Sequence, residues 1–383
     1  MPLPAPADPL PATEDPFLGT PYRAVRRLAA GGMGEVFVIL HRELGREFVA
    51  KLLHGRFAAD GRLLDRMRIE AQALGRLDHP NIVSISGFGT ARDGRPFLVM
   101  ERLHGQTLAA ELAARGRLPV HEAVAYARQL LMALSAAHTI GVVHRDIKPD
   151  NLFLVSPSSG VPFLKVLDFG VARVLPGYDE HAPQPLALPT DTGIVVGTPR
   201  FVSPEGATGA KVDQRADLYT AGLVLYTMLA GRGPFDHLRG EAELLTAHAS
   251  VRPAPPSTVA GVPLPPALDG AVLHALAKRP EDRFQTAQEF IEALDYVTAS
   301  LSAAEPSVTN HEAARRVAPQ AAPILPAFSV VSEPAASPSS SGLRRVSTAP
   351  SNGARFALLF IGVAVATALI VSQIVRAVLA GRS

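Results

Sequence analysis

The stretch His144-Arg145-Asp146-Ile147-Lys148-Pro149-Asp150-Asn151 gathers acidic, basic and amide side chains at short, fixed spacing. The tripeptide Asp168-Phe169-Gly170 follows seventeen residues after Asn151. The amide oxygen of Asn151 and the carboxylate oxygens of Asp168 are hard ligands that suit Mg²⁺. A single tripeptide would be compatible with a polar loop that binds nothing, but two motifs in this order argue against that. We therefore expect this stretch to carry the chemistry of the chain.

The residue types fit the transfer of a phosphoryl group, in which a protein mainly positions groups and neutralises charge. Asp146 would accept the proton of an attacking hydroxyl, and Lys148 would lie beside the moving γ-phosphate. Asn151 and Asp168 would hold Mg²⁺, with Mn²⁺ as the alternative metal.

The pattern H-R-D-x-K-x-x-N followed by D-F-G resembles the signature set of protein kinases, and a lysine two residues after the aspartate resembles their Ser/Thr class. The resemblance extends over residues 22–297. It implies an α+β fold in two lobes: a small β-rich lobe (22–103) and a larger helical lobe (104–297), with ATP and Mg²⁺ between them. The Gly32-Met33-Gly34 form and the segment G-T-P-x-F-x-S-P-E look most like bacterial eukaryotic-like Ser/Thr kinases.

A glycine-rich hairpin is expected at the start of the small lobe, where glycines let a backbone approach phosphates closely. By the resemblance, its nucleotide-binding residues are Leu28, Ala29, Ala30, Gly31, Gly32, Met33, Gly34, Glu35 and Val36. Ala29 replaces the first glycine of the family pattern G-x-G-x-x-G-x-V, which adds a methyl group near the nucleotide. A hairpin of this kind without any ligand is the competing interpretation.

Lys51 lies in the apolar run Phe48 to Leu53, which predicts a buried strand. A lysine there is costly unless it is paired, and a lysine that reaches solvent at a strand edge is the alternative. The resemblance implies that Lys51 binds ATP phosphates and pairs with Glu70, in a helix expected over 62–77. Val49 replaces the usual alanine of the V-A-I-K motif.

The stretch Met100-Glu101-Arg102-Leu103 resembles the hinge between kinase lobes. By that resemblance, the backbone C=O of Glu101 and N–H of Leu103 would bind adenine, and Met100 would line the back of the pocket. The side chains themselves do not distinguish these residues from an ordinary strand end.

Apolar periodicity predicts the remaining elements of the large lobe. Helices are expected over Thr107 to Arg115, Val120 to Ile140, Leu218 to Leu229 and Leu264 to Leu276, and the lobe is expected to close around Phe290 to Val297. A hairpin of Leu152 to Val155 with Leu164 to Leu167 would bring Asn151 and Asp168 together.

The segment Val171 to Glu205 resembles an activation segment. Phosphorylation of Thr190 or Thr192 would add charge that could dock on Arg145, whereas unmodified loop threonines are the alternative. Thr198 is expected near Asp146 and Lys148.

Three further expectations concern support of the large lobe. Glu205, if buried, needs a cation, and the resemblance implies Arg283. Asp217 would brace the catalytic loop from below. His138 is expected to be a packed histidine of the core and not a ligand.

Composition sets the wider frame. The chain of 383 residues contains no cysteine, which excludes disulfides and thiolate sites. The net charge of +2, with scattered basic residues, gives no reason to expect nucleic acid as a partner. Residues 1–21 read as a disordered Pro/Ala-rich leader, and residues 298–355 read as a disordered linker.

Residues 356–375 form an uncharged apolar run between Arg355 and Arg376, long enough to cross a bilayer as a helix. A short tail, 376–383, follows. A buried globular helix is the alternative, but the neighbouring linker offers nothing for it to pack against. We expect a single-pass protein of the cytoplasmic membrane with its kinase lobes in the cytoplasm.

The sequence thus predicts a membrane-tethered Ser/Thr protein kinase that acts on protein substrates and activates itself by autophosphorylation, with a homodimer as the partner for transfer in trans. A catalytically weak, pseudokinase-like scaffold is the alternative, motivated by Ala29 and Val49. A small-molecule kinase on the same fold is a third option, against which the segment Gly197 to Glu205 speaks.

Overall fold

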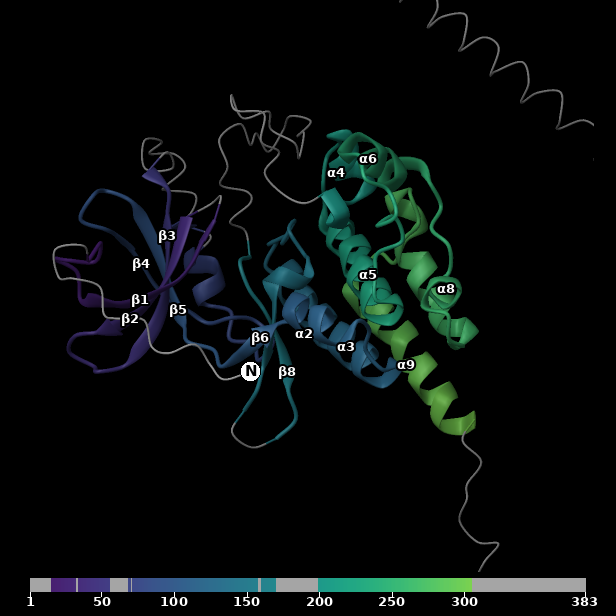
Figure 1. Cartoon of the computed structure of the whole chain (residues 1–383), viewed down its shortest axis with the longest axis horizontal. Helices are drawn as coiled ribbons and strands as arrows, with labels where there is room; N and C mark the ends of the chain where they lie inside the picture. The colour runs from purple at the N-terminus through teal and green to yellow at the C-terminus, as the bar shows by residue number, and fades with distance from the viewer. Residues whose placement is uncertain are drawn as a thin grey trace, which may run out of the picture. The chain divides into compact units, whose positions relative to one another are not determined.

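The computed structural model describes residues 15–31, 34–55, 68–69, 71–157, 160–169 and 199–304. An antiparallel sheet forms the small lobe, in the order β1-β2-β3-β5-β4 (Figure 1). Its strands are β1 (Tyr22–Gly31), β2 (Gly34–His41), β3 (Glu47–Leu53), β4 (Ile85–Thr90) and β5 (Pro96–Glu101). Residues 71–75, within the stretch predicted as a helix, are helical.

Asp15 and Phe17 are already packed against the sheet of the small lobe, earlier in the chain than the sequence predicts. Phe17 is fully buried and packs edge-on against Phe37 and Phe97, with ring centroids 5.6 and 5.0 Å apart. Asp15 accepts hydrogen bonds from the backbone N–H groups of Phe17 and Ala24. The expectation of a disordered leader reaching residue 21 was therefore wrong for its last part, because one aromatic side chain anchors it to the sheet.

A short three-stranded sheet follows in the chain, in the order β6-β7-β8. It consists of β6 (Gly105–Thr107), β7 (Leu152–Val155) and β8 (Phe163–Val166). The antiparallel pair β7–β8 confirms the predicted hairpin, and Leu152 lies opposite Val166. Asn151 and Asp168 therefore flank the two strands at the same end.

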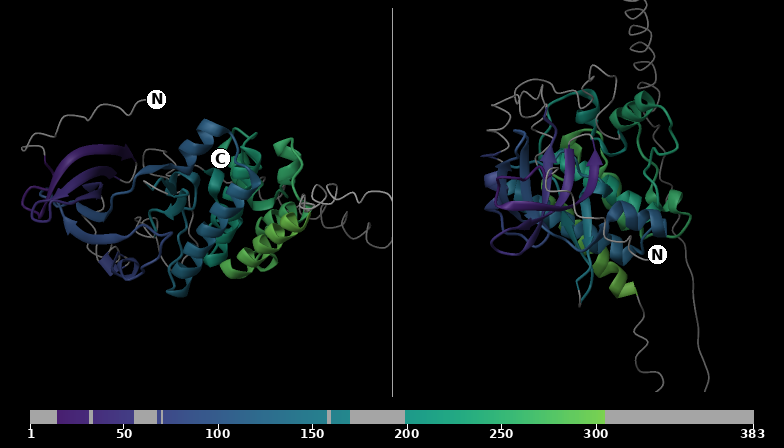
Figure 2. Two further views of the ribbon diagram at one scale, coloured as in Figure 1. Left: turned by 90° about the horizontal axis from the view of Figure 1, so that it is seen from below. Right: turned by 60° about the vertical axis from the view of Figure 1, so that its left-hand side comes forward.

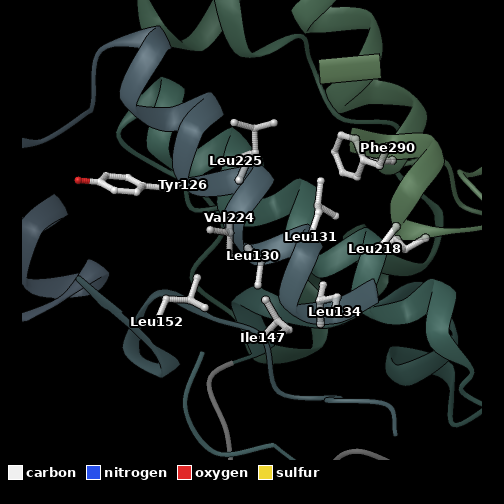
Figure 3. Packing of buried hydrophobic residues seen from close by; sticks show 14 of the residues in the cluster. Tyr126, Leu130, Leu131, Leu134, Ile147, Leu152, Leu218, Val224, Leu225 and Phe290 are labelled. Atoms are coloured by element: carbon white, nitrogen blue, oxygen red, sulfur yellow. The ribbon is translucent and has the colours of Figure 1, made fainter. Parts of the chain in front are cut away.

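Helices make up most of the large lobe, and α3, α5, α8 and α9 pack against one another (Figure 1 and Figure 2). Figure 3 shows leucines of α3 and α5 meeting Ile147 of the catalytic loop and Phe290 of α9. The helices are α2 (Leu108–Arg115), α3 (Val120–Thr139), α4 (Pro204–Thr208), α5 (Gln214–Ala230), α6 (Glu241–Ser250), α7 (Pro256–Ala260), α8 (Pro266–Ala275) and α9 (Ala287–Ala304).

Capping residues explain several of the helix boundaries. Thr107 and Asp213 accept hydrogen bonds from backbone N–H groups in the first turns of α2 and α5. Gly231 ends α5 in the left-handed conformation, with φ of 76°, which glycine adopts without a steric penalty. At the other end of the lobe, α9 continues to Ala304, past the boundary at residue 297 that the sequence predicts.

None of the helices among the described residues is both long and apolar enough to cross a membrane. The predicted span, 356–375, and the predicted linker from residue 305 onward lie outside the described residues.

Candidate active site

Asp146, Lys148 and Asn151 converge on one carboxylate. The ammonium group of Lys148 lies 2.9 and 2.7 Å from the two oxygens of Asp146. Asn151 donates from Nδ2 to the backbone C=O of Asp146 at 2.7 Å and to its Oδ2 at 2.9 Å. The short 3₁₀ helix Pro149–Asn151 makes the turn that returns Asn151 to Asp146. The structure therefore brings together three of the predicted catalytic and metal-binding side chains.

His144 is fully buried, and its ring hydrogen-bonds the backbone on both sides of it. Its Nδ1 accepts a hydrogen bond from the N–H of Asp146, so in the neutral ring the proton resides on Nε2. Nε2 lies 2.8 Å from the C=O of Leu167 and can donate to it. One ring thus connects the loop that carries Asp146 to the residue before Asp168.

Asp217, in the first turn of α5, braces the same loop from the core, as the sequence predicts. Its carboxylate is fully buried and accepts hydrogen bonds from the N–H groups of His144 and Arg145, each at 2.8 Å. His138 of α3 lies 2.8 Å from Oδ2 of Asp217, which confirms a structural role for this histidine. Arg145 has a φ of 67°, a left-handed conformation that a non-glycine residue adopts only when its surroundings impose it.

Lys51 of β3 reaches Asp168, and their side chains form an ion pair at 2.8 Å. Val36 of β2 pairs in register with Lys51, so the glycine-rich hairpin lies beside this lysine. The predicted partner Glu70 lies outside the described residues. Asp168, at φ of 56°, is the second non-glycine residue with a left-handed backbone among those described.

Asn151 and Asp168 fit the predicted role as cation ligands. The N–H of Leu167 donates to the C=O of Asn151 at 2.8 Å, which holds the two segments side by side. Both hydrogen bonds of the Asn151 amide use Nδ2, so its amide oxygen is the atom left for a cation. An amide oxygen and a carboxylate form the hard donor pair that suits Mg²⁺.

The glycine-rich hairpin joins β1 to β2, with Gly31 paired to Gly34, and Gly32 and Met33 lie outside the described residues. Gly34 has a φ of 154°, and an added Cβ would lie 2.1 Å from the carbonyl oxygen of Leu52. This glycine is therefore required by its packing against β3, whatever ligand it contacts. The other predicted residues of the hairpin, Leu28, Ala29 and Ala30, are exposed on β1.

Glu35 connects the hairpin to the rest of the small lobe. It pairs with Arg27 at 2.9 Å and with Arg95 of the β4–β5 turn at 3.1 Å. Burial raises the pKa of Glu35, but the hydrogen bonds from Arg27 and Arg95 outweigh it, so the pKa lies below its ordinary value. Ion pairs of Glu35 thus connect the hairpin to β1 and to the β4–β5 turn.

The expected hinge residues lie at the end of β5, with Met100 buried, Glu101 at the strand terminus and Leu103 just beyond it. The structure adds a contact that sequence reasoning missed. Lys165 of β8 donates to Glu101 Oε1 at 2.7 Å and to the C=O of Ile82 at 3.1 Å. A lysine inside the apolar strand Phe163–Val166 is the same signal that singled out Lys51.

The segment after residue 198 is anchored in the core. Glu205 and Arg283 form two parallel hydrogen bonds, of 2.8 and 2.7 Å, and both residues are buried. This confirms the predicted pair. Ser203 caps α4 by accepting from Gly206 N–H. Thr198 and the two candidate phosphorylation sites, Thr190 and Thr192, lie outside the described residues.

Comparisons with known proteins agree with this geometry. A family model for the protein kinase domain matches residues 22–293. The chain is 42% identical over 294 residues to the serine/threonine-protein kinase Pkn1 of Myxococcus xanthus, covering 76% of this chain and 40% of the relative. It is 34% identical over 310 residues to the serine/threonine-protein kinase PknA of Mycobacterium tuberculosis, covering 79% and 66%.

A comparison with solved structures also finds a protein kinase domain. The crystal structure of the Mycobacterium tuberculosis PknI kinase domain matches with a TM-score of 0.56 and 28% identity, covering 76% of this chain and all of that domain. The chain spans less than half the length of Pkn1, so the match concerns the region that the two share.

Proposed function

Because this chain belongs to the protein kinase family, we propose that it transfers the γ-phosphate of ATP to serine or threonine hydroxyls of proteins. The observation that carries the proposal is the cluster in which Lys148 and Asn151 both hydrogen-bond the Asp146 carboxylate. The names of the curated relatives support the Ser/Thr class.

In the proposed reaction, the acceptor hydroxyl gives its proton to Asp146. The oxygen of the acceptor hydroxyl forms a bond to the γ-phosphorus. At the same time, the bond from that phosphorus to the β–γ bridging oxygen breaks, and ADP leaves. Asn151 and Lys148 hold the carboxylate in one orientation through three hydrogen bonds. The charge of Lys148, already beside Asp146, would also offset the charge on the transferred group.

Lys51 and Asp168 would serve the nucleotide side of the reaction. Lys51 would bind the ATP phosphates. To do so, its ammonium group would give up part of its present ion pair with Asp168. Asp168 and Asn151 would hold Mg²⁺, which when bound neutralises charge on the phosphates. The backbone of Glu101 and Leu103 would bind adenine at the end of β5, beside the buried Met100.

Two parts of the proposal rest on the sequence. Autophosphorylation at Thr190 or Thr192, in trans within a homodimer, would place a phosphate where Arg145 could pair with it. The uncharged run 356–375 would tether the kinase lobes to the cytoplasmic face of a membrane. Retention of the full chain on vesicles, compared with a chain shortened at Ser300, tests the tether.

The test of activity uses the full chain, labelled ATP, Mg²⁺ and a mixture of acceptor proteins, with Lys51→Met as the comparison. Mass spectrometry would locate the label. Label on serine and threonine, produced only by the parent protein, is the expected result. Label on a small molecule alone would favour the third option named above. Thermal stabilisation by MgATP in both proteins, without transfer, would favour the scaffold, and Ala29→Gly would then test whether the lost glycine is the cause.

A further inference from the structure

Residues 15–20, the N-terminal strap, cover an apolar face of the small-lobe sheet. Side chains alternate along β3, so Ala50 and Leu52 lie on the face opposite Lys51, here called the outer face. Both belong to a buried cluster to which β1, β2, β5 and the β4–β5 turn also contribute. Among the described residues, Phe17 is the one member of this cluster that comes from outside the sheet and its turns. The sheet therefore presents an aromatic slot that the strap fills.

Point contacts join the strap to the sheet, because its residues precede β1 and belong to no strand. The Asp15 carboxylate accepts a hydrogen bond from the N–H of Ala24 at 3.2 Å and lies 3.6 Å from the guanidinium of Arg42. The C=O of Pro16 accepts from the N–H of Arg92 at 3.0 Å. Strand β1 and the turns after β2 and β4 supply these donors, so the sheet itself carries the polar groups that surround the slot.

The strap is organised by its own hydrogen bonds. Oδ1 of Asp15 also accepts from the N–H of Phe17 at 2.9 Å. The backbone N–H and the hydroxyl of Thr20 both donate to the C=O of Phe17, at 3.0 and 2.7 Å. Pro16, between the acid and the aromatic residue, has a fixed φ and no N–H that needs a partner. A segment ordered in this way loses less conformational entropy when it binds.

The turn between Phe17 and β1 is open. Gly19 has a φ of 87°, a conformation that suits glycine, and an added Cβ there would meet no atom within 4 Å. The side chain of Leu18 is 42% exposed. Packing therefore does not hold this turn, and rotation there would lift Asp15 and Phe17 away while β1 stays paired with β2.

We propose that the outer face of the small lobe is a peptide-recognition site for a segment with an acid two residues before an aromatic residue, and that residues 15–17 are its resident, exchangeable ligand. The carboxylate is recognised by Arg42 and the N–H of Ala24, and the ring is recognised by Phe37 and Phe97, which it meets edge-on. A partner protein that carries this pattern would compete with the strap. The inference is independent of the proposed function, because it involves neither ATP nor transfer of phosphate.

The test vacates the site and refills it with a separate peptide. In the full chain, Asp15→Ala combined with Phe17→Ala removes both anchors, and the probe is a synthetic peptide of residues 15–21 with blocked ends. We expect the double variant to melt at a lower temperature than the parent protein and the peptide to raise that temperature saturably. Half-saturation should occur at about 1 mM or below, the effective concentration that a short tether provides. The parent protein, whose site is filled by its own strap, should shift much less.

Altered peptides test the recognition chemistry. A peptide with Phe17→Ala should bind about tenfold or more weakly, because it no longer buries an aromatic ring. A peptide with Asp15→Ala should also bind more weakly, whereas Leu18→Ala, a change at the exposed position, should bind like the unaltered peptide. Absence of stabilisation at several times the expected half-saturating concentration would overturn the proposal. Equal stabilisation by the Phe17→Ala peptide would overturn it as well.

A measurement on the filled site tests exchange directly and remains decisive if the double variant does not fold. With a fluorinated phenylalanine at position 17 of the full chain, the ¹⁹F NMR spectrum should show one resonance of a buried ring. Added peptide should produce a second resonance, of an exposed ring, that grows with the peptide concentration. A spectrum that stays unchanged would show that the strap is a fixed part of the sheet and would overturn the proposal, whether or not the protein transfers phosphate.

Discussion

The catalytic loop and the glycine-rich hairpin are held by different kinds of contact. The loop His144–Asn151 is secured from the core by the fully buried Asp217 and by the buried ring of His144. The hairpin is tethered by Glu35, whose partner Arg27 is 58% exposed at its side chain. Buried polar contacts are expensive to break because a group left unpaired cannot reach water, whereas exposed pairs contribute little. The large lobe should therefore be intolerant of single polar substitutions and the hairpin tolerant.

The largest effect is expected at the buried pair Glu205–Arg283. Arg283→Met leaves the Glu205 carboxylate buried without its cation, and we expect it to lower the free energy of unfolding by about 3–5 kcal/mol. Chemical denaturation of the full chain measures this. The double variant Glu205→Leu with Arg283→Met should recover much of the loss; if it is no more stable than Arg283→Met alone, the unpaired charge is not the cause.

Acidification should lower the free energy of unfolding through the buried neutral side chain of His248. Its pKa is about 4 in the folded protein, below the ordinary histidine value of 6.5 that applies to the unfolded chain, so between these pH values the unfolded chain binds more protons. Stability therefore falls as pH drops through this window, by at most about 1.4 kcal/mol per pH unit. His248→Gln should flatten the dependence relative to the parent protein. Identical slopes in the two proteins would contradict the burial of a neutral histidine.

An intermediate effect is expected between the lobes. Lys165→Met removes one of the donors to the Glu101 carboxylate at the end of β5, and the other donor, the N–H of Ser84, remains. We expect a loss of about 1–3 kcal/mol in the free energy of unfolding, with Lys165→Arg as the control. A loss no larger than that of an exposed pair would show that this contact does not secure the strand end.

The smallest effect is expected in the hairpin. Glu35→Gln weakens its pairs with Arg27 and Arg95, and we expect only about 0.2–1 kcal/mol in unfolding free energy, reduced further by salt. A loss as large as that of Arg283→Met would break the contrast between the two regions.

The same contrast explains what could be predicted from the sequence. The loop motif, the β7–β8 hairpin, the support by Asp217 and the Glu205–Arg283 pair could be predicted because a motif or an apolar period marks each of them. Lys165 carried the same signal as Lys51, a cation in an apolar strand, but no motif drew attention to it. The resemblance to a kinase hinge concerns only the backbone of its partner Glu101, so it does not predict a role for the Glu101 carboxylate.

Two features had no usable signal. Phe17 is a single aromatic residue in a proline-rich stretch, and composition cannot show that Phe37 and Phe97 form a site for it. Tyr219, His248 and Lys278 come from separate elements, and only the folded large lobe brings them together. Contacts of this kind depend on tertiary packing and leave no local pattern.

The most direct test of the account concerns Asp146. Asp146→Asn keeps the shape of the side chain but cannot accept a proton as the carboxylate does. The control is Asp150→Asn, an exposed change in the same loop. We expect kcat for transfer to a peptide to fall roughly 10²- to 10⁴-fold in Asp146→Asn and to stay unchanged in the control. The KM for ATP should change little. An Asp146→Asn protein that keeps the parent kcat would contradict the assignment of this loop as the catalytic centre.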